Sequence, residues 1–320
     1  MIEIRSLSSP SSEVDPFFFQ NNLFGTEAWC SAHGDKCSIF GIFQKGECVG
    51  IFCLYIYTRL GKRFVITPPN APHCGLKLRL RAEKPHSLQG EIKRIMAALA
   101  QFFKSTFKGA YLDVVMPESI VDMQAFQGTG YHVSPAYTYL LDLSPEPEHL
   151  FNEMSSARRK NIRDAQKSGF SLRWDGDSKE LLLLIGAGLK RSGVASHSEL
   201  HSKLLNDRRE GFRSLSVSRD DTLLAAAICA LDGEVAYYFA GGHLAGANES
   251  NAGALALWEL ILMARDSACR KFDFMGSSVP GIERFFRGFG AELTPRFRVH
   301  SDPGLIGWLQ KQKQKLSAGK

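Results

Sequence analysis

The sequence predicts a mixed α/β protein made of two domains. Its 320 residues suit about two domains of roughly 150 residues each. Short segments of strand-like apolar alternation are interspersed with segments in which apolar residues recur every three or four positions, as in helices. Two prolines in Ser144-Pro145-Glu146-Pro147 interrupt this pattern near the middle of the chain, since proline disfavours both helix and sheet ladder. We therefore expect one domain at residues 1–145 and a second at 146–320.

The first domain is expected to be rich in strands. The expected strands are Cys37–Gln44, Glu47–Tyr57, Arg63–Thr67, Ala110–Met116 and Ala136–Leu143. Lys45-Gly46 predicts a hairpin turn between the first two. One helix is expected at Ser87–Phe107, where apolar residues such as Ile95, Leu99 and Phe103 fall on one side.

The second domain is expected to alternate helices and strands. The expected helices are Glu148–Lys167, Lys179–Arg191, Ser198–Arg209, Gly253–Cys269 and Ile282–Phe289. The expected strands are Phe170–Trp174, Phe212–Ser218, Thr222–Leu231, Glu234–Ala240, Lys271–Met275 and Pro295–His300. Asp232-Gly233 is a strong signal for a hairpin.

Composition limits the classes of function. The net charge of +6 permits an anionic partner such as a nucleotide, a cofactor phosphate or tRNA, without requiring one. No apolar run reaches the length of a membrane span. The seven cysteines include no CxxC pair, which favours reduced thiols in a cytoplasmic protein and argues against zinc. His197 and His201 have helical spacing but lack the glutamate of a HExxH motif, so no metal site is expected.

The helix expected at Glu148–Lys167 carries an arginine in its apolar stripe. Basic residues on the other side (Arg159, Lys160, Arg163 and Lys167) are most simply a solvated face. Arg158 falls among the apolar residues, where an unpaired charge is costly. Either its side chain extends to solvent or it meets a carboxylate or phosphate, and we favour the second.

Two further segments have features of an anion-binding site. Asn251, Gly253 and Ala254 are expected to open a buried helix, and a small-residue turn at a helix N-terminus presents N–H groups to an anion. Plain capping by Asn251 or Ser250 explains them equally well. Ser277 and Ser278 follow a strand, where α/β sheets bind ligands, although both could instead cap the next helix.

The segment Lys271–Leu293 predicts a strand and a supporting helix. Phe272 and Phe274 face one side of the strand and Asp273 the other, as in a half-buried strand. In the helix, Ile282, Phe285, Phe286 and Phe289 share a narrow face. Glu283 and Arg287 are spaced to form an ion pair, whereas Arg284 has no such partner within the helix.

Taken in order, four segments of the second half resemble the FemAB-like branch of the GNAT acyltransferase superfamily. They are LFNEMSSARRKNIRDAQKSGF, AAAICALDGEVAYYFAGG, ALALWELILMARDSACRKFDFMGS and GIERFFRGFG. The resemblance implies two GNAT-like domains in tandem. It also implies transfer of an acyl or aminoacyl group to an amine without a covalent enzyme intermediate. Known relatives extend peptidoglycan bridge peptides from aminoacyl-tRNA, and looser relatives are thought to use acyl-CoA.

The resemblance also suggests site residues. The acyl group would lie where Glu234–Ala240 and Lys271–Met275 diverge, with a pyrophosphate near Asn251, Gly253 and Ala254. Backbone of Phe239, Ala240 and Gly241 would polarise the acyl carbonyl. Asp273, His243 or Glu283 would accept the amine proton, and Tyr238 would return one to the leaving group. The substrate-binding candidates are Arg158, Ser277, Ser278, Arg284 and Arg287.

Two departures from the family pattern affect the expected donor. Only Gly253-Ala254 approximates the usual phosphate loop, and Phe286 stands where the tRNA-using relatives tend to have a lysine. We expect an N-acyltransferase that uses acyl-CoA as co-substrate and holds no tightly bound cofactor and no metal. The alternatives are an aminoacyl-tRNA-dependent transferase acting on a peptidoglycan precursor and a non-catalytic module that binds tRNA or such a precursor. The acceptor amine, small molecule or peptide, and the oligomeric state stay open.

Overall fold

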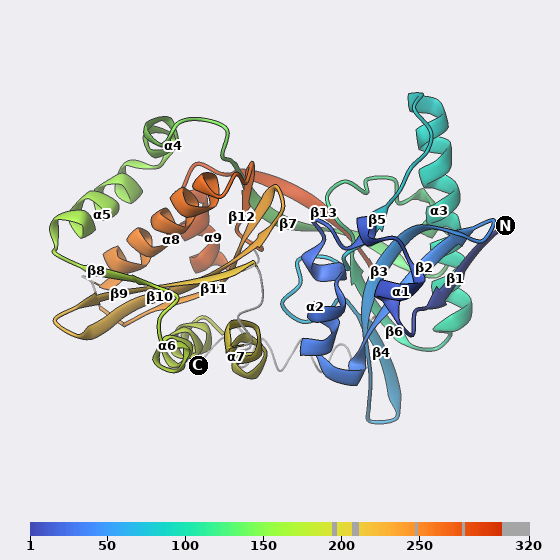
Figure 1. Ribbon diagram of the computed structural model, residues 1–320, viewed down its shortest axis with the longest axis horizontal. Helices are drawn as coiled ribbons and strands as arrows, with labels where there is room; N and C mark the ends of the chain where they lie inside the picture. The colour runs from blue at the N-terminus through green and yellow to red at the C-terminus, as the bar shows by residue number, and fades with distance from the viewer. Residues whose placement is uncertain (194–196, 207–210, 247–248, 277–278, 303–320) are drawn as a thin grey trace. The chain divides into compact units, whose positions relative to one another are not determined.

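The chain folds into two compact units (Figure 1). The computed structural model describes residues 1–193, 197–206, 211–246, 249–276 and 279–302. Unit 1 comprises Met1–Ala136 and residues 295–302, and unit 2 comprises residues 137–294. Two strands carry the chain between them, β7 (His132–Asp142) and β13 (Glu292–His300). The boundary expected at residues 145 and 146 lies within unit 2, because Leu140–Asp142 already pair with a strand of that unit.

Unit 1 is built on a mixed sheet with the strand order β1-β2-β3-β4-β6-β13. Its strands are β1 (Ile2–Ser6), β2 (Cys37–Gln44), β3 (Glu47–Arg59), β4 (Lys62–Ile66), β5 (Lys77–Leu78, paired with β3) and β6 (Tyr111–Val115). Neighbours are antiparallel except β4 and β6, which are parallel and are joined by helix α3 (Pro85–Thr106).

Both faces of the unit 1 sheet are covered. On one face α3 buries Ile95, Leu99 and Phe103 against the strands. On the other face lie the short helices α1 (Pro10–Glu13) and α2 (Glu27–Ala32), with Cys30 of α2 among the buried residues. The sequence pattern did not predict β1, α1, α2 or β5, all of which are short.

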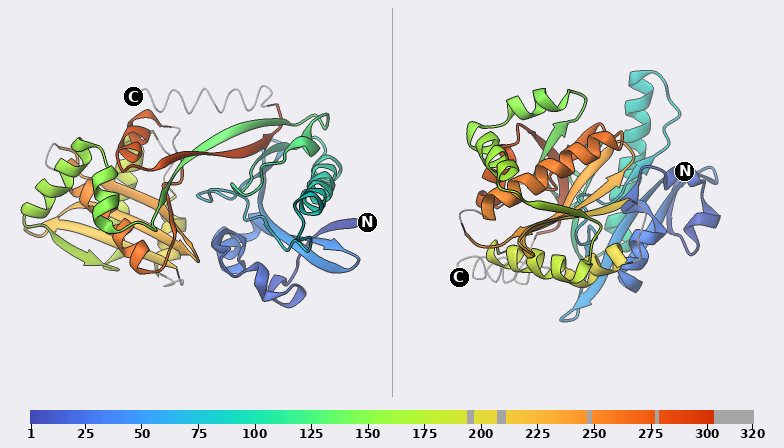
Figure 2. Two further views of the ribbon diagram at one scale, coloured as in Figure 1. Left: turned by 90° about the horizontal axis from the view of Figure 1, so that it is seen from above. Right: turned by 60° about the vertical axis from the view of Figure 1, so that its left-hand side comes forward.

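Unit 2 has the strand order β7-β12-β11-β10-β9-β8. The remaining strands are β8 (Ser171–Trp174), β9 (Phe212–Arg219), β10 (Thr222–Asp232), β11 (Val235–His243) and β12 (Lys271–Asp273). Only β11 and β12 are parallel, and helix α8 (Glu249–Asp266) joins them. Helices α5 (Ser156–Lys167) and α8 cover one face of the sheet, and α6 (Ser178–Arg191) and α7 (Ser198–Asn206) cover the other (Figures 1 and 2).

The helix expected at Glu148–Lys167 is wrong as one element, because two helices occupy this stretch. α4 (Pro147–Glu153) ends at Met154, whose backbone is extended, and Ser155 then caps α5. The Ser155 hydroxyl accepts the N–H of Arg158 at 3.3 Å, which satisfies one free donor of the first turn. The extended Met154 and the Ser155 cap thus separate the two helices, with no proline or glycine between them.

Two other expected bounds also change. α8 begins at Glu249, four residues before the expected start at Gly253. Asn251, Gly253 and Ala254 therefore lie inside its first two turns and not in a preceding loop. β12 is three residues long and is not half-buried, since Asp273 is 0% exposed. Helix α9 (Pro280–Arg287) follows it. No helix among the described residues is long and apolar enough to cross a membrane.

Candidate functional site

The pairing between the two parallel strands of unit 2 stops before β11 ends. β11 and β12 pair only from Val235–Tyr237 to Lys271–Asp273, and β11 then continues for six more residues to His243. Its other edge stays paired with β10 over this stretch. The β10–β11 register shifts between Ile228 and Cys229, where Phe239 is the extra residue of a β-bulge. The pairing thus ends where β12 itself ends, within the stretch in which the resemblance implied a divergence.

Unit 1 has the same strand–helix–strand arrangement but no comparable opening. β4 ends at Ile66, one residue before Thr67, whose N–H donates to Asp113 O of β6 at 3.0 Å. The Thr67 hydroxyl accepts the N–H of Val115 at 2.8 Å, and Cys74 N–H donates to Val115 O at 2.8 Å. The edge of β6 is thus tied to the segment that follows β4, which points to unit 2 as the location of a site.

Tyr238 lies at the point of divergence. Its ring packs edge-on against Phe286 of α9, with centroids 5.5 Å apart. Its hydroxyl lies beside Gly241, only 1.8 Å from the position that a Cβ on this glycine would take. The hydroxyl has no hydrogen-bond partner among the described residues, and burial raises the pKa of Tyr238 above its usual value. A neutral phenol therefore stands next to the diverging strand.

The two glycines at the end of β11 have different reasons to be glycine. Gly241 leaves room for the Tyr238 hydroxyl. Gly242 lets α6 approach the strand, because a Cβ there would lie 2.7 Å from the Cα of Ile185 and from the carbonyl oxygen of Leu184. Gly253, in contrast, has only ordinary contacts, the nearest being 3.6 Å to Cβ of His243.

α9 lies over the ends of both diverging strands. Phe286 packs against Tyr238 and also against Phe274, whose ring centroid is 5.1 Å away. Glu283, in the first turn of α9, accepts a hydrogen bond on Oε1 from the hydroxyl of Tyr139 at 2.6 Å, and the same oxygen forms an ion pair with Arg287 Nε at 3.0 Å. The bond to the carboxylate raises the pKa of Tyr139. Glu283 is therefore a partly exposed, oriented carboxylate.

The arginines of α9 divide as their spacing predicted. Arg287 forms the expected ion pair with Glu283 across one helical turn. Arg284 is exposed and has no ion-pair partner among the residues that the structure describes. It is available to a ligand, although exposure alone does not identify one.

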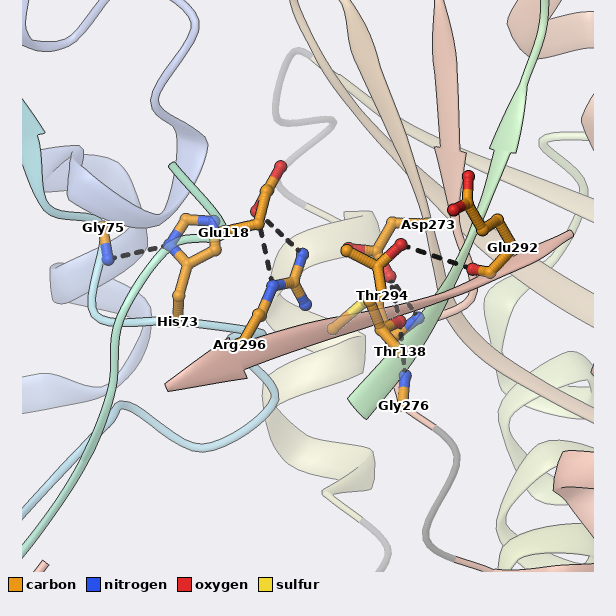
Figure 3. A network of polar contacts seen from close by, with 10 residues as sticks. His73, Gly75, Glu118, Thr138, Asp273, Gly276, Glu292, Thr294 and Arg296 are labelled. Carbon is orange, nitrogen blue, oxygen red and sulfur yellow. Dashed lines mark hydrogen bonds and ion pairs between the residues drawn. The ribbon is translucent and has the colours of Figure 1, made fainter. Parts of the chain in front are cut away.

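Asp273 is part of a buried polar network that shapes the turn after β12 (Figure 3). Its Oδ1 accepts the Thr138 hydroxyl proton at 2.5 Å and the N–H of Met275 at 2.7 Å. The Thr138 oxygen in turn accepts the N–H of Gly276 at 3.0 Å. Met275 and Gly276 have φ values of 59° and 132°. With its side chain wholly buried, Asp273 holds this strained turn and does not reach a solvent-accessible amine. Ser277 and Ser278 lie outside the described residues.

Figure 3 also shows a second polar cluster, which belongs to unit 1. Arg296, 4% exposed, pairs with Glu118 at 3.3 Å. His73 is buried beside it and accepts the N–H of Gly75 on Nδ1 at 3.1 Å. Burial and the charge of Arg296 lower the pKa of His73 to about 3, so its imidazole stays neutral. These contacts are structural ones within unit 1.

Arg158 meets aromatic rings where an acidic partner was expected. Its guanidinium lies 4.1 Å from the ring centroid of Phe285 and 5.1 Å from that of Phe289, and Nη2 donates to Phe285 O at 3.4 Å. Its Nε is buried without a hydrogen-bond partner among the described residues. Burial lowers the pKa of Arg158 to about 10. The cation is thus held by ring faces and retains an unused donor.

The basic face of α5 is largely engaged within the protein. Arg159 donates to the carbonyl oxygens of Asn152 and Met154 at 2.6 and 2.5 Å, which closes the end of α4. Lys160 pairs with Asp164 at 2.6 Å. These contacts favour the simpler interpretation of the basic run as a face of the fold.

The remaining candidates lie at the end of β11 and the start of α8. His243 is exposed, Asn251 and Gly253 are half-buried, and Ala254 is buried. Phe239 and Ala240 are buried, and Gly241 is half-buried. The Phe239 ring packs edge-on against His201 of α7, and burial lowers the pKa of His201 to about 4. His201 is therefore a core histidine.

Sequence reasoning missed Thr138 and Tyr139. Both are on β7, on the first-domain side of the proline-rich break, yet they bond to Asp273 and Glu283, more than 130 residues further on. The alternating pattern of Tyr137–Leu141 was visible, but nothing in it identifies partners so distant in sequence.

Comparison with known proteins agrees with this geometry. Residues 156–287 match the family model described as an acetyltransferase (GNAT) domain. The crystal structure of FemX superimposes with a TM-score of 0.67 at 13% identity, covering 96% of this chain and 99% of that one. A tandem GNAT protein from the clavulanic acid biosynthesis pathway gives a TM-score of 0.53 at 14% identity, covering 95% and 100%.

A third similar structure is the C-terminal domain (DUF2156) of a putative lysylphosphatidylglycerol synthetase from Agrobacterium fabrum. Its TM-score is 0.54 at 11% identity, with coverage of 82% of this chain and 84% of that one. The comparison with curated protein sequences found no match. At these identities the structural likenesses establish the fold, and they confirm the mixed α/β architecture expected from the sequence.

Proposed function

We propose that the protein is an N-acyltransferase whose reaction takes place at the end of β11. The proposal starts from the tandem GNAT fold of the FemAB-like branch and from the match of residues 156–287 to a GNAT acetyltransferase domain. The observation that carries this proposal is the divergence of β11 from β12 after Tyr237. An acyl group seated there would lie along Phe239–Gly241, on the strand edge that no longer faces β12. Backbone N–H groups directed at a developing oxyanion are a strong source of transition-state stabilisation.

The proposed reaction is direct attack of an amine on the acyl carbonyl carbon. The amine nitrogen forms the new bond, and its proton passes to a base. Glu283 suits that role because its carboxylate is partly exposed and is oriented by Tyr139 and Arg287. His243 is exposed at the strand end and is the second choice. Asp273 is the weakest of the three sequence candidates, because its carboxylate already accepts hydrogen bonds from Thr138 and Met275.

Tyr238 is proposed to protonate the leaving group. Burial raises its pKa, so the hydroxyl carries its proton at neutral pH and can deliver it to a departing thiolate or alkoxide. Gly241 is part of this proposal, because only a residue without a side chain leaves the hydroxyl its place.

An acyl-CoA thioester is the proposed donor. Arg158 supports this donor, since its buried Nε has no hydrogen-bond partner among the described residues and could donate to an anion. The first turn of α8 is proposed as a second anion-binding element, because N–H groups at a helix N-terminus attract anions. Arg284 and Arg287 are proposed to bind donor or acceptor, as are Ser277 and Ser278.

An aminoacyl-tRNA donor is the second candidate. It is supported by the likeness to FemX along 96% of the chain, since FemAB-like relatives take their aminoacyl group from tRNA. One feature counts against it. The basic face of α5 is largely engaged within the protein, because Arg159 donates to backbone carbonyl oxygens and Lys160 pairs with Asp164.

The test is calorimetric titration with CoA and acetyl-CoA, followed by chromatographic detection of CoA released in the presence of a panel of amines. Saturable binding and amine-dependent CoA release, both reduced in Tyr238→Phe, are the expected results. No binding of either compound at millimolar concentration would exclude the thioester donor. Aminoacyl-tRNA would then be tested, and failure of both donors would leave the non-catalytic binding module.

A further inference from the structure

Three cysteines of unit 1 bring their sulfur atoms together between α2 and the sheet. Cys30 is in α2, Cys37 is the first residue of β2, and Cys53 is in β3. The Sγ atoms of Cys30 and Cys37 are 2.6 Å apart, and those of Cys30 and Cys53 are 3.6 Å apart. All three sulfurs lie within 4.8 Å of one another. None of these three cysteines is among the residues proposed for acyl transfer.

Two of the three cysteines are accessible from a cavity. The cavity has a volume of about 400 Å³ and is lined by Cys30 and Cys37 together with Ser8, Ser11 and Glu27. Cys53 is 0% exposed and does not line it. A small polar molecule entering this cavity would therefore meet Cys37 and Cys30 and not the third thiol.

The environment distinguishes the two accessible thiols. The contact between the two sulfurs lowers the pKa of Cys37 and raises that of Cys30. The nearby His33 lowers the pKa of Cys37 further. The attacking species in thiol chemistry is the thiolate. Cys37, which is half-buried while Cys30 is buried, is thus the more accessible thiol and the nucleophile of the pair.

A metal ion fits this geometry less well. Zinc–sulfur bonds of about 2.3 Å in a tetrahedral site hold sulfurs roughly 3.8 Å apart, whereas Cys30 and Cys37 are at 2.6 Å. Among the described residues no histidine, aspartate or glutamate joins the three sulfurs as a fourth ligand, and the ring nitrogens of His33 lie 2.9 Å from Trp29 O and 3.0 Å from Pro69 O. The distance between the two sulfurs fits a direct thiol–thiol contact better than two ligands of one zinc ion.

We propose that Cys37 and Cys30 form a reactive thiol pair that undergoes thiol–disulfide exchange with a small disulfide bound in the adjacent cavity. The Cys37 thiolate attacks one sulfur of the disulfide RSSR, forming a mixed disulfide and releasing RS⁻. Cys30 then attacks the Cys37 sulfur, which forms the Cys30–Cys37 bond and releases a second RS⁻. The proton of Cys30 passes to a released thiolate or to water. Two electrons move from the cysteine pair to RSSR, which leaves as two thiols.

The sequence makes the three pairings of the cluster distinguishable. Trypsin cuts after Arg5, Lys36, Lys45 and Arg59, so Cys30 falls in residues 6–36, Cys37 in 37–45, and Cys53, with Cys48, in 46–59. A Cys30–Cys37 disulfide therefore joins two separate peptides, and any bond to Cys53 involves the third.

The experiment treats the reduced full chain with oxidised glutathione, quenches free thiols with an alkylating agent and maps the tryptic peptides by mass spectrometry. The expected product joins residues 6–36 to 37–45. Cys30→Ser is expected to stop at glutathione on residues 37–45. The matched control is Cys48→Ala, a half-buried cysteine on the same hairpin whose thiol donates to Gly50 O at 3.3 Å. It should form the same linked peptide as the unmodified sequence.

A rate measurement on the unmodified sequence makes the test independent of variant folding. At pH 6 Cys37 should be alkylated faster than Cys48 by on the order of tenfold or more, because its thiolate fraction is larger. A disulfide that involves residues 46–59, equal alkylation rates, or the recovery of all thiols free after glutathione treatment would each overturn the proposal. So would protection of Cys37 and Cys53 together by added zinc, which would instead identify a metal site.

Discussion

Gly241 and Gly242 are neighbours in β11, but an added methyl group would meet different obstacles at the two positions. At Gly242 the new Cβ would lie 2.7 Å from Ile185 Cα and from Leu184 O, whereas ordinary contacts are 3.4–4 Å. These are backbone atoms of α6, so no rotamer change relieves the overlap. In Gly242→Ala the helix must therefore move by about 0.7 Å or more.

The cost of that movement follows from known overpacking effects. Overpacked cores lose about 1–3 kcal/mol, and replacing glycine by alanine returns about 0.4–1 kcal/mol through the unfolded chain. We expect Gly242→Ala to lower the free energy of unfolding of unit 2 by about 1–2 kcal/mol. With a urea m-value of about 2 kcal/mol/M, the midpoint of unfolding falls by about 0.5–1 M.

Gly241→Ala should behave differently. Its Cβ would meet side-chain atoms only, the hydroxyl and Cζ of Tyr238 at 1.8 and 2.6 Å, so the tyrosine ring and not a helix backbone must shift. The midpoint should change by less than half as much as in Gly242→Ala, while acyl transfer slows by about tenfold or more because the proton donor is displaced.

The assay compares both variants with the unmodified sequence by urea unfolding, followed by circular dichroism. Because the two units can unfold in separate steps, brief proteolysis with identification of peptides from residues 137–294 assigns the transition to unit 2. Equal midpoints for the two variants, or a greater loss of stability in Gly241→Ala, would refute the packing argument.

Three further results are expected. The bond to Glu283 raises the folded-state pKa of Tyr139, so the stabilisation from this bond is full below about pH 10 and is lost as pH rises through that pKa. Tyr139→Phe should therefore lower the unfolding midpoint at pH 8. A difference in midpoint that did not shrink at pH 11 would contradict this. Arg158→Met should change stability by less than about 1 kcal/mol, because it keeps contact with Phe285 and removes a partly buried charge, but should raise the KM for the anionic donor; an unchanged KM in an active enzyme would exclude Arg158 from donor binding. Arg287→Ala should cost less than about 0.5 kcal/mol, as exposed helical ion pairs do, and thermal unfolding with a larger loss would assign it a structural role.

Periodicity predicted the regular elements well where one face of the element is buried. β2 was predicted to the residue and α3 to within two residues at either end, because apolar positions recur clearly along both. The start of α8 was not predicted, since a helix that is apolar on nearly every side has no stripe to mark its first turn. Glu249, Ser250 and Asn251 look like a loop but belong to the helix.

The site was predicted in part. Spacing alone predicted the Glu283–Arg287 pair, and the resemblance implied a divergence of β11 and β12 in the stretch where their pairing ends. The burial of Asp273 was not foreseen, because a carboxylate at an alternating position predicts solvent unless its partner is known. That partner, Thr138, is 135 residues away in sequence, and contacts across such distances depend on the folded topology.

The return of β13 to unit 1 has a consequence for folding during synthesis. Arg298–His300 pair with Asp113–Val115 of β6, and Val299 is 0% exposed in the core that β6 shares with α3. A ribosome that has completed residue 136 must therefore add more than 150 residues before the sheet of unit 1 can close. At about 5–20 residues per second this takes on the order of ten seconds. All of unit 2 is made within that interval, so the second half of the chain can fold first, while the first half waits with an unprotected strand edge.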